Sequence, residues 1–156
     1  MSLLYSKLKL PQYAYLPGKM QRALTRTDIP SFEVLPLSLK KWNENEAYLY
    51  GIDLFNHGFY YEAHEVWEEL WHEVGHKTLP GKFLKILIQL SAIQLKLLSE
   101  EPSPAKRLAQ RAQALLLELC REIPSSSETY LGIHLKTLSK NLSQKKTTLQ
   151  VFLPLA

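Results

Sequence analysis

The chain contains 156 residues, 46% of them hydrophobic and 22% charged, which is typical of a single globular domain that buries its own core. Its one cysteine, Cys120, excludes an internal disulfide framework and suits a reducing compartment. The net charge of +4 is modest, and Lys and Arg are not densely clustered, so the composition argues against a nucleic-acid binder.

No segment has the pattern of a membrane span or a secretory signal. The longest apolar run, around residues 83–98, is interrupted by four polar residues: Lys85, Gln89, Gln94 and Lys96. A span needs about 20 largely apolar residues, and the first residues lack the basic, apolar and small-residue order of a signal peptide. We therefore expect a cytosolic protein, or one inside an organelle if a transit peptide is removed before this numbering begins.

The N-terminal quarter of the chain lacks helical periodicity. It holds four of the nine prolines and is predicted to form an extended arm over residues 1–39 that lies on the surface. The expected anchors of this arm are apolar and aromatic: Tyr13, Tyr15, Leu16 and Phe32.

From about residue 40 the apolar residues take on the period of amphipathic helices. The first helix is predicted from about Lys40 to Gly58, where a glycine suits a left-handed terminator. The second is predicted from about Tyr60 to Val74, because apolar residues recur there at i, i+3, i+4 and i+7. Gly75 ends this helix.

Three further helices follow. The third is predicted from Pro80 to about Leu98 and is apolar on most faces, which indicates a central position. The fourth begins with Ser103 as its N-cap, followed by a proline, and ends near Arg121. A fifth, weaker helix covers about residues 131–142.

Helices joined by short turns pack as antiparallel neighbours. The sequence therefore predicts an all-α fold, a compact up-and-down antiparallel bundle of four to five helices with an extended N-terminal arm. The bundle would cover residues 40–145, and an extended tail would follow over 146–156. No segment before this tail alternates like a β-strand.

Residues 72–76, HEVGH, match the H-E-x-x-H pattern of zinc peptidases. The longer form of that pattern needs a glycine and a histidine where this chain has Leu79 and Lys82. A helix end at Gly75 would also loosen the one-turn spacing that the two ligands need. We therefore interpret His72 and His76 as a solvated helix terminus near the negative end of the helix dipole.

An earlier pair, His64 and Glu68, lies one turn apart beside the apolar stripe. Two interpretations stay open. The pair can stabilise the helix surface locally by up to about 1 kcal/mol, which the spacing alone favours. It can also bind a metal or exchange protons, together with Glu65. Glu62, near the third helical position, can cap the first turn.

Two segments of the chain, LFNHGFYYEAHEVWEELW at residues 54–71 and FLKILIQLSA at 83–92, resemble a known family. It is an uncharacterised family of small all-helical proteins, filed among domains of unknown function and sometimes labelled predicted metal-dependent hydrolases. Its pattern is similar to E-A-H-E-x-W-E-x-x-W, followed by F-L-x-G-L-I-Q-L-A. This chain departs from it with Ile86 in place of a glycine and with Lys96 where many members carry a histidine.

The resemblance implies a helical bundle whose shared polar residues form a pocket. We expect a binding or interaction module for a small molecule or a protein, with the ligand-binding residues Tyr61, Glu62, His64, Trp67, Trp71 and Gln89. The alternative is a metal-dependent hydrolase that binds a divalent metal through His64 and Glu68 and uses Glu65 as general base; its third ligand must come from elsewhere. The sequence leaves open whether the chain forms a homo-oligomer.

Overall fold

The computed structural model describes residues 4–17, 29–30 and 32–144 of the chain. The N-terminal part, as far as it is described, forms neither helix nor strand, and the first regular element is the short 3-10 helix η1. The elements then follow in this order: η1 (Trp42–Glu44), α2 (Glu46–Asn56), α3 (Tyr60–Val74), α4 (Leu79–Leu98), α5 (Pro102–Glu122), β1 (Thr129–Tyr130), β2 (Ile133–His134) and α6 (Leu135–Gln144).

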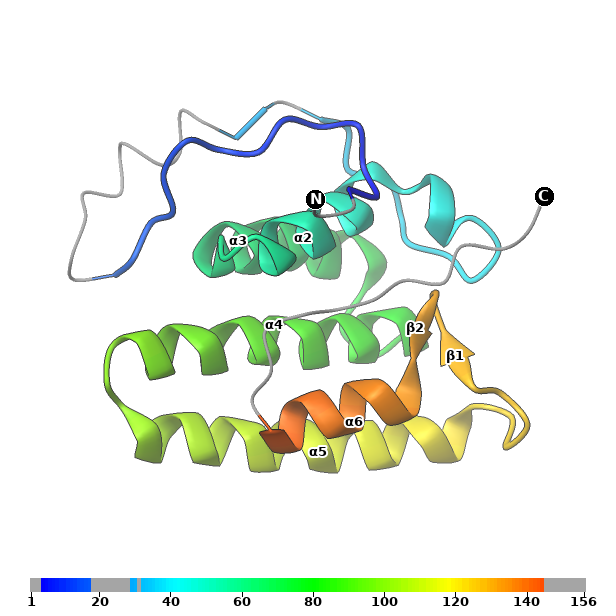
Figure 1. Cartoon of the computed structure of the whole chain (residues 1–156). Coiled ribbons are helices and arrows are strands. Elements are labelled where there is room, and N and C mark those ends of the chain that lie inside the picture. Colours follow the sequence, from blue (N-terminus) through cyan, green and yellow to red (C-terminus); the bar gives the residue numbers. More distant parts are fainter. Residues whose placement is uncertain (1–3, 18–28, 31, 145–156) are drawn as a thin grey trace.

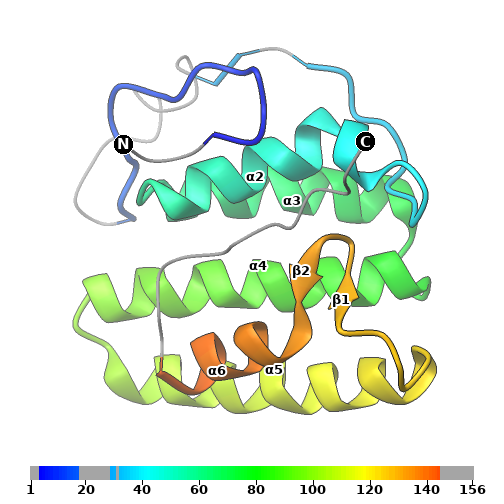
Figure 2. The same cartoon turned by 45° about the vertical axis from the view of Figure 1, so that its right-hand side comes forward.

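The helices stack in layers, with α2 and α3 in one layer, α4 in the middle, and α5 with α6 in the outer layer (Figures 1 and 2). Helix α2 packs on α3, α3 packs on α4, and α4 packs on α5. The predicted all-α bundle is therefore confirmed. No helix in the described part of the chain is long and apolar enough to cross a membrane.

Local sequence signals explain where the central helices begin and end. The Asn45 side chain accepts a hydrogen bond from the Tyr48 backbone N–H and caps α2. Thr78 caps α4 in the same way, by accepting from the Gly81 N–H at 3.1 Å. Helix α3 ends at Gly75, whose φ of 93° favours glycine. The predicted bounds of α3 and α4 agree with the structure to within a residue.

The C-terminal third differs from the prediction in two places. Helix α5 begins at Pro102 with Glu101 as N-cap, so Ser103 lies in its first turn and does not cap it. An antiparallel hairpin of two short strands, β1 and β2, overlaps the start of the predicted fifth helix. The observed helix, α6, begins only at Leu135. The hairpin turn has positive φ at Leu131 and Gly132. Residues of a right-handed α-helix have negative φ, so a helix cannot run through this turn.

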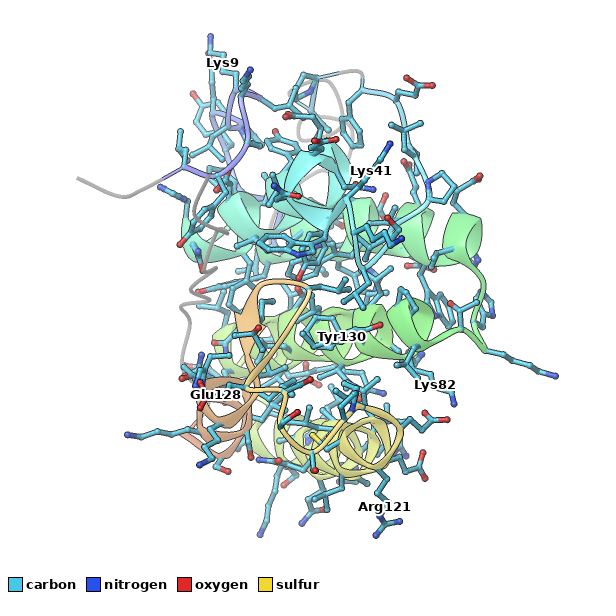
Figure 3. The ribbon with its side chains drawn as sticks, turned by 90° about the vertical axis from the view of Figure 1, so that its right-hand side faces the viewer. Lys9, Lys41, Lys82, Arg121, Glu128 and Tyr130 are labelled. Carbon is cyan, nitrogen blue, oxygen red and sulfur yellow. The ribbon has the colours of Figure 1, made fainter. Side chains whose placement is uncertain are left out.

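The hairpin is attached to the bundle by buried contacts. The Tyr48 hydroxyl donates to the Leu131 carbonyl oxygen at 2.7 Å, and the ring of Trp42 lies against Gly132 so closely that a Cβ there would clash with it. Tyr130, labelled in Figure 3, packs edge-on against Phe83 of α4 with ring centroids 5.1 Å apart. These contacts are long-range in sequence, which is why local periodicity did not predict the hairpin.

The described part of the N-terminal arm contacts α2 and α3, and buried polar groups hold residues 5–15 there. The Asp53 carboxylate accepts hydrogen bonds from the Tyr5 and Ser6 backbone N–H groups, each at 2.8 Å, and from the Ser6 hydroxyl at 2.7 Å. The Tyr50 hydroxyl donates to the Lys9 carbonyl oxygen at 2.7 Å. Of the predicted anchors, Phe32 packs on Tyr50, whereas Tyr13 is 60% exposed. The predicted tail, 146–156, lies outside the described residues.

Candidate functional site

Three imidazoles and one carboxylate form a row along one face of α3 and past its C-terminal end. His64 Nδ1 lies 3.4 Å from Glu68 Oε2, and the other oxygen of Glu68 lies 3.8 Å from His72 Nε2. His72 Nδ1 in turn lies 3.1 Å from His76 Nε2. His64, Glu68 and His72 are aligned because residues four apart lie on the same side of a helix. His76, beyond the end of α3, continues the row.

The contact between His64 and Glu68 has ion-pair distance but not hydrogen-bond alignment. His64 Nδ1 is buried and makes no hydrogen bond in the described part of the chain, although the Glu68 carboxylate lies 3.4 Å away. Both side chains are partly exposed, at 29% and 41%, so solvent screens the pair and its stabilising effect is small. The pair stabilises the helix surface only weakly.

A small surface pocket of about 230 Å³ opens beside this row and is lined by Glu65, Glu68, Glu69 and His72. Helix α3 contains five glutamates and neither lysine nor arginine. Carboxylates three or four residues apart on one helix face repel one another. The pocket is therefore a region of negative potential on a chain whose net charge is positive.

The two tryptophans of α3 have different surroundings. Trp67 is fully buried, and its indole N–H donates to the Tyr48 carbonyl oxygen at 3.3 Å, so its ring is part of the core and not a wall of a surface pocket. Trp71 is half-buried at the edge of the row. The His76 ring stacks on Trp71 at 3.6 Å and 9°, and Lys85 Nζ lies 4.8 Å from the Trp71 ring centroid.

Glu62 and Tyr61, at the N-terminal end of α3, contact the arm. Glu62 is fully buried, and its Oε2 accepts from the Tyr15 backbone N–H at 2.8 Å. Its Oε1 is buried without a hydrogen-bond partner in the described part of the chain. Burial raises the pKa of this carboxyl, the backbone N–H donors oppose that shift, and the charge of Glu65 adds to it. The Tyr61 ring lies between Tyr15, at 4.5 Å, and His64, at 6.4 Å.

Several predicted ligand-binding residues share an unusual property. Within the described residues, a buried side-chain atom lacks a hydrogen-bond partner in each of the following: Glu62, His64, Trp71, Gln89 and Ser91. All but Ser91 belong to the predicted ligand-binding set. Buried polar atoms are normally paired, because an unpaired one costs about 1–3 kcal/mol. Each of these atoms lowers the stability of the fold unless a water or a ligand pairs with it.

The arrangement fits a metal centre at His64 and Glu68 poorly. These two side chains contact each other, and the described residues include no group of three or more His, Cys, Asp or Glu that could hold a metal ion. A catalytic zinc site needs three protein ligands. Within the described chain, the third ligand that the hydrolase interpretation requires is therefore not in place.

Sequence reasoning missed Glu69 and the close contact of His72 with His76. The signal for Glu69 was its position one turn after Glu65, on the same face. His76 lies beyond the end of α3, as expected, but its ring is held against Trp71 and His72 instead of being free in solvent.

Residues 48–108 match the model of a protein family described as a domain of unknown function (DUF309). The predicted relationship to a family of unknown function is thereby confirmed for this part of the chain. No curated protein and no solved structure shows significant similarity to the chain.

Proposed function

Because residues 48–108 match a family whose function is unknown, we propose a function from the site itself: a small helical binding module whose α3 face binds a cationic group. The supporting observation is the pocket on α3 that is lined by Glu65, Glu68, Glu69 and His72, with three carboxylates and neither lysine nor arginine. The group bound would be an amine or guanidinium of a small molecule, or of a basic segment of a partner protein.

Electrostatics supports this choice of ligand. Glu65 and Glu69 are one turn apart, and Glu68 lies between them in the sequence, so three carboxylates share a small surface. Like charges at this spacing destabilise a helix by about 0.2–0.5 kcal/mol a pair. A bound cation would relieve this repulsion and gain attraction from each carboxylate, and the attraction would weaken as salt screens it.

The same site supports a hydrolase less well. A metal-dependent hydrolase would use His64 and Glu68 as ligands and Glu65 as general base, and its third ligand would have to lie outside the described residues. A cytosolic location stays a prediction from the sequence, and whether the chain forms a homo-oligomer stays open.

Calorimetric titration with spermidine tests the proposal, because this probe carries only amines and alkyl carbons. We expect saturable binding at low salt that is at least tenfold weaker in the double variant Glu65→Gln/Glu69→Gln. The matched control is Glu118→Gln, which removes an exposed carboxylate from α5, away from the pocket. Equal affinities for the wild type and the double variant would disprove a cation site on α3.

A further inference from the structure

The nitrogen atoms of His72 and His76 converge at the C-terminal end of α3. His72 Nδ1 and His76 Nε2 are 3.1 Å apart, and both side chains are exposed. We propose that these two atoms form a surface chelate for a first-row transition-metal dication such as Zn²⁺, Ni²⁺ or Cu²⁺. The proposal goes beyond the cation-binding pocket, because it uses imidazole nitrogens and not the carboxylates that line the pocket.

The separation of the two atoms suits a shared metal ion. Imidazole nitrogens bind zinc at about 2.0–2.1 Å. Two nitrogens at that distance from one ion, with an angle of about 90–110° between them, are about 2.9–3.4 Å apart. The observed 3.1 Å lies within this range. An N–H···N hydrogen bond between the two rings has a similar length. A metal ion would lie off the line that joins the two nitrogens, so both rings would turn until their lone pairs converge on it.

Neighbouring groups favour the His72 tautomer that a chelate needs and orient the His76 ring, while His76 would have to carry its proton on Nδ1 for its Nε2 to bind the ion. The Glu68 carboxylate lies 3.8 Å from Nε2 of His72 and favours the tautomer with its proton on that atom. Nδ1, which faces His76, then carries the lone pair. Histidines that bind metals commonly have a carboxylate beside the other ring nitrogen. Stacking on Trp71, at 9° between the ring planes, fixes the plane of His76.

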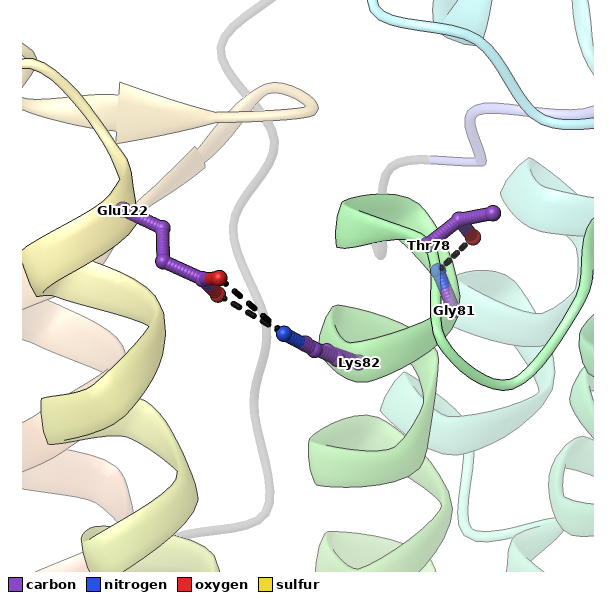
Figure 4. A network of polar contacts seen from close by, with 4 residues as sticks. All are labelled: Thr78, Gly81, Lys82 and Glu122. Atoms are coloured by element: carbon purple, nitrogen blue, oxygen red, sulfur yellow. Dashed lines mark hydrogen bonds and ion pairs between the residues drawn. The ribbon is translucent and has the colours of Figure 1, made fainter.

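The turn that carries His76 is itself well braced, although it lies beyond the helix. The Thr78 hydroxyl donates to the Gly75 carbonyl oxygen at 2.9 Å and accepts from the Gly81 N–H, the contact drawn in Figure 4. Gly81 packs so closely on the Gly75 carbonyl that a Cβ there would clash with it. This turn therefore holds His76 near His72, in the place where the sequence alone suggested a frayed end.

The choice of ion follows from the donor atoms. Imidazole suits zinc, copper and nickel, whereas magnesium and calcium prefer oxygen ligands. The described residues contain no third His, Cys, Asp or Glu placed to join the chelate, so water would complete the coordination of the ion. Such a site binds a metal, and we derive no hydrolytic step from it.

The test is calorimetric titration of the full chain with Zn²⁺, with Mg²⁺ as the control ion. We expect one Zn²⁺ per chain in the wild type and at least tenfold weaker binding in His76→Phe. This substitution removes both ring nitrogens but keeps an aromatic ring for stacking on Trp71, so the turn should stay folded. His72→Ala should weaken binding similarly, and His134→Ala, a histidine on β2, should not.

A second readout locates the ion. Paramagnetic Cu²⁺ quenches indole fluorescence at short range, and Trp71 is in direct contact with His76. Cu²⁺ should therefore quench the wild type strongly and Trp71→Phe much less. Equal Zn²⁺ affinity in the wild type and His76→Phe, or no Zn²⁺ binding by the wild type, would overturn the proposal. Neither result bears on spermidine binding, which depends on Glu65 and Glu69.

Discussion

Glu62 shows how a single buried side chain makes the stability of the fold depend on pH. Burial raises the pKa of its carboxyl above the ordinary value of 4.5. The folded protein therefore binds the proton more tightly than the unfolded chain does. It follows that the free energy of unfolding falls as the pH rises from about 4.5 through the raised pKa. The charged form is the one that the fold tolerates less well.

The variant Glu62→Gln should remove this pH dependence, because the amide is neutral and its carbonyl oxygen can still accept from the Tyr15 N–H. We expect its free energy of unfolding, relative to the wild type, to rise between about pH 4 and about pH 7. Urea denaturation at a series of pH values measures this difference. Parallel curves for the two proteins would show that Glu62 does not cause the effect. Glu118→Gln, at an exposed residue of α5, is the matched control.

At the scale of elements, the close contact of α2 with α3 depends on Gly51. A Cβ built there would clash with Nε1 of the buried Trp67. Gly51→Ala should therefore lower the free energy of unfolding by about 1–3 kcal/mol through overpacking, even though alanine favours a helix by about 1 kcal/mol. Urea denaturation measures the loss. In the background of Trp67→Phe, whose ring is smaller, the same substitution should cost less, and an unchanged cost would argue against this contact as the cause.

The elements also show what the sequence could and could not predict. Helices α3 and α4 were predicted closely because periodicity, Gly75 and Pro80 are local signals. The hairpin of β1 and β2 was missed because contacts with Trp42 and Tyr48, more than eighty residues away, hold it in place. In the candidate site, too, local signals were predictive and long-range packing was not. His64, Glu65 and Glu68 were found from their spacing on α3, whereas Glu69 was missed. The burial of Trp67 and the convergence of His72 with His76 depend on packing.

At the scale of the whole molecule, the arm and the bundle are joined by polar groups that the sequence did not identify. The predicted anchors were aromatic, whereas the most direct attachments are the hydrogen bonds to Asp53 and Glu62 and the one from Tyr50. Burial raises the pKa of the Tyr50 phenol to about 12, with smaller contributions from the charges of Glu62 and Asp53, so the phenol stays a neutral donor. Burying a carboxylate costs free energy unless it is hydrogen-bonded. The hydrogen bonds that the arm donates offset this cost for Asp53.

Asp53→Asn should therefore release the beginning of the arm while the bundle stays folded. An amide offers only one acceptor oxygen and turns an N–H group toward the Tyr5 and Ser6 donors, so the variant should lose about 1.5–3 kcal/mol of unfolding free energy. Hydrogen exchange followed by NMR should show the Tyr5 and Ser6 amides exchanging at least tenfold faster. The Tyr15 amide, which Glu62 holds, should change little if the two attachments act independently. Unchanged exchange at Tyr5 and Ser6 would mean that contacts other than Asp53 hold the arm to the bundle.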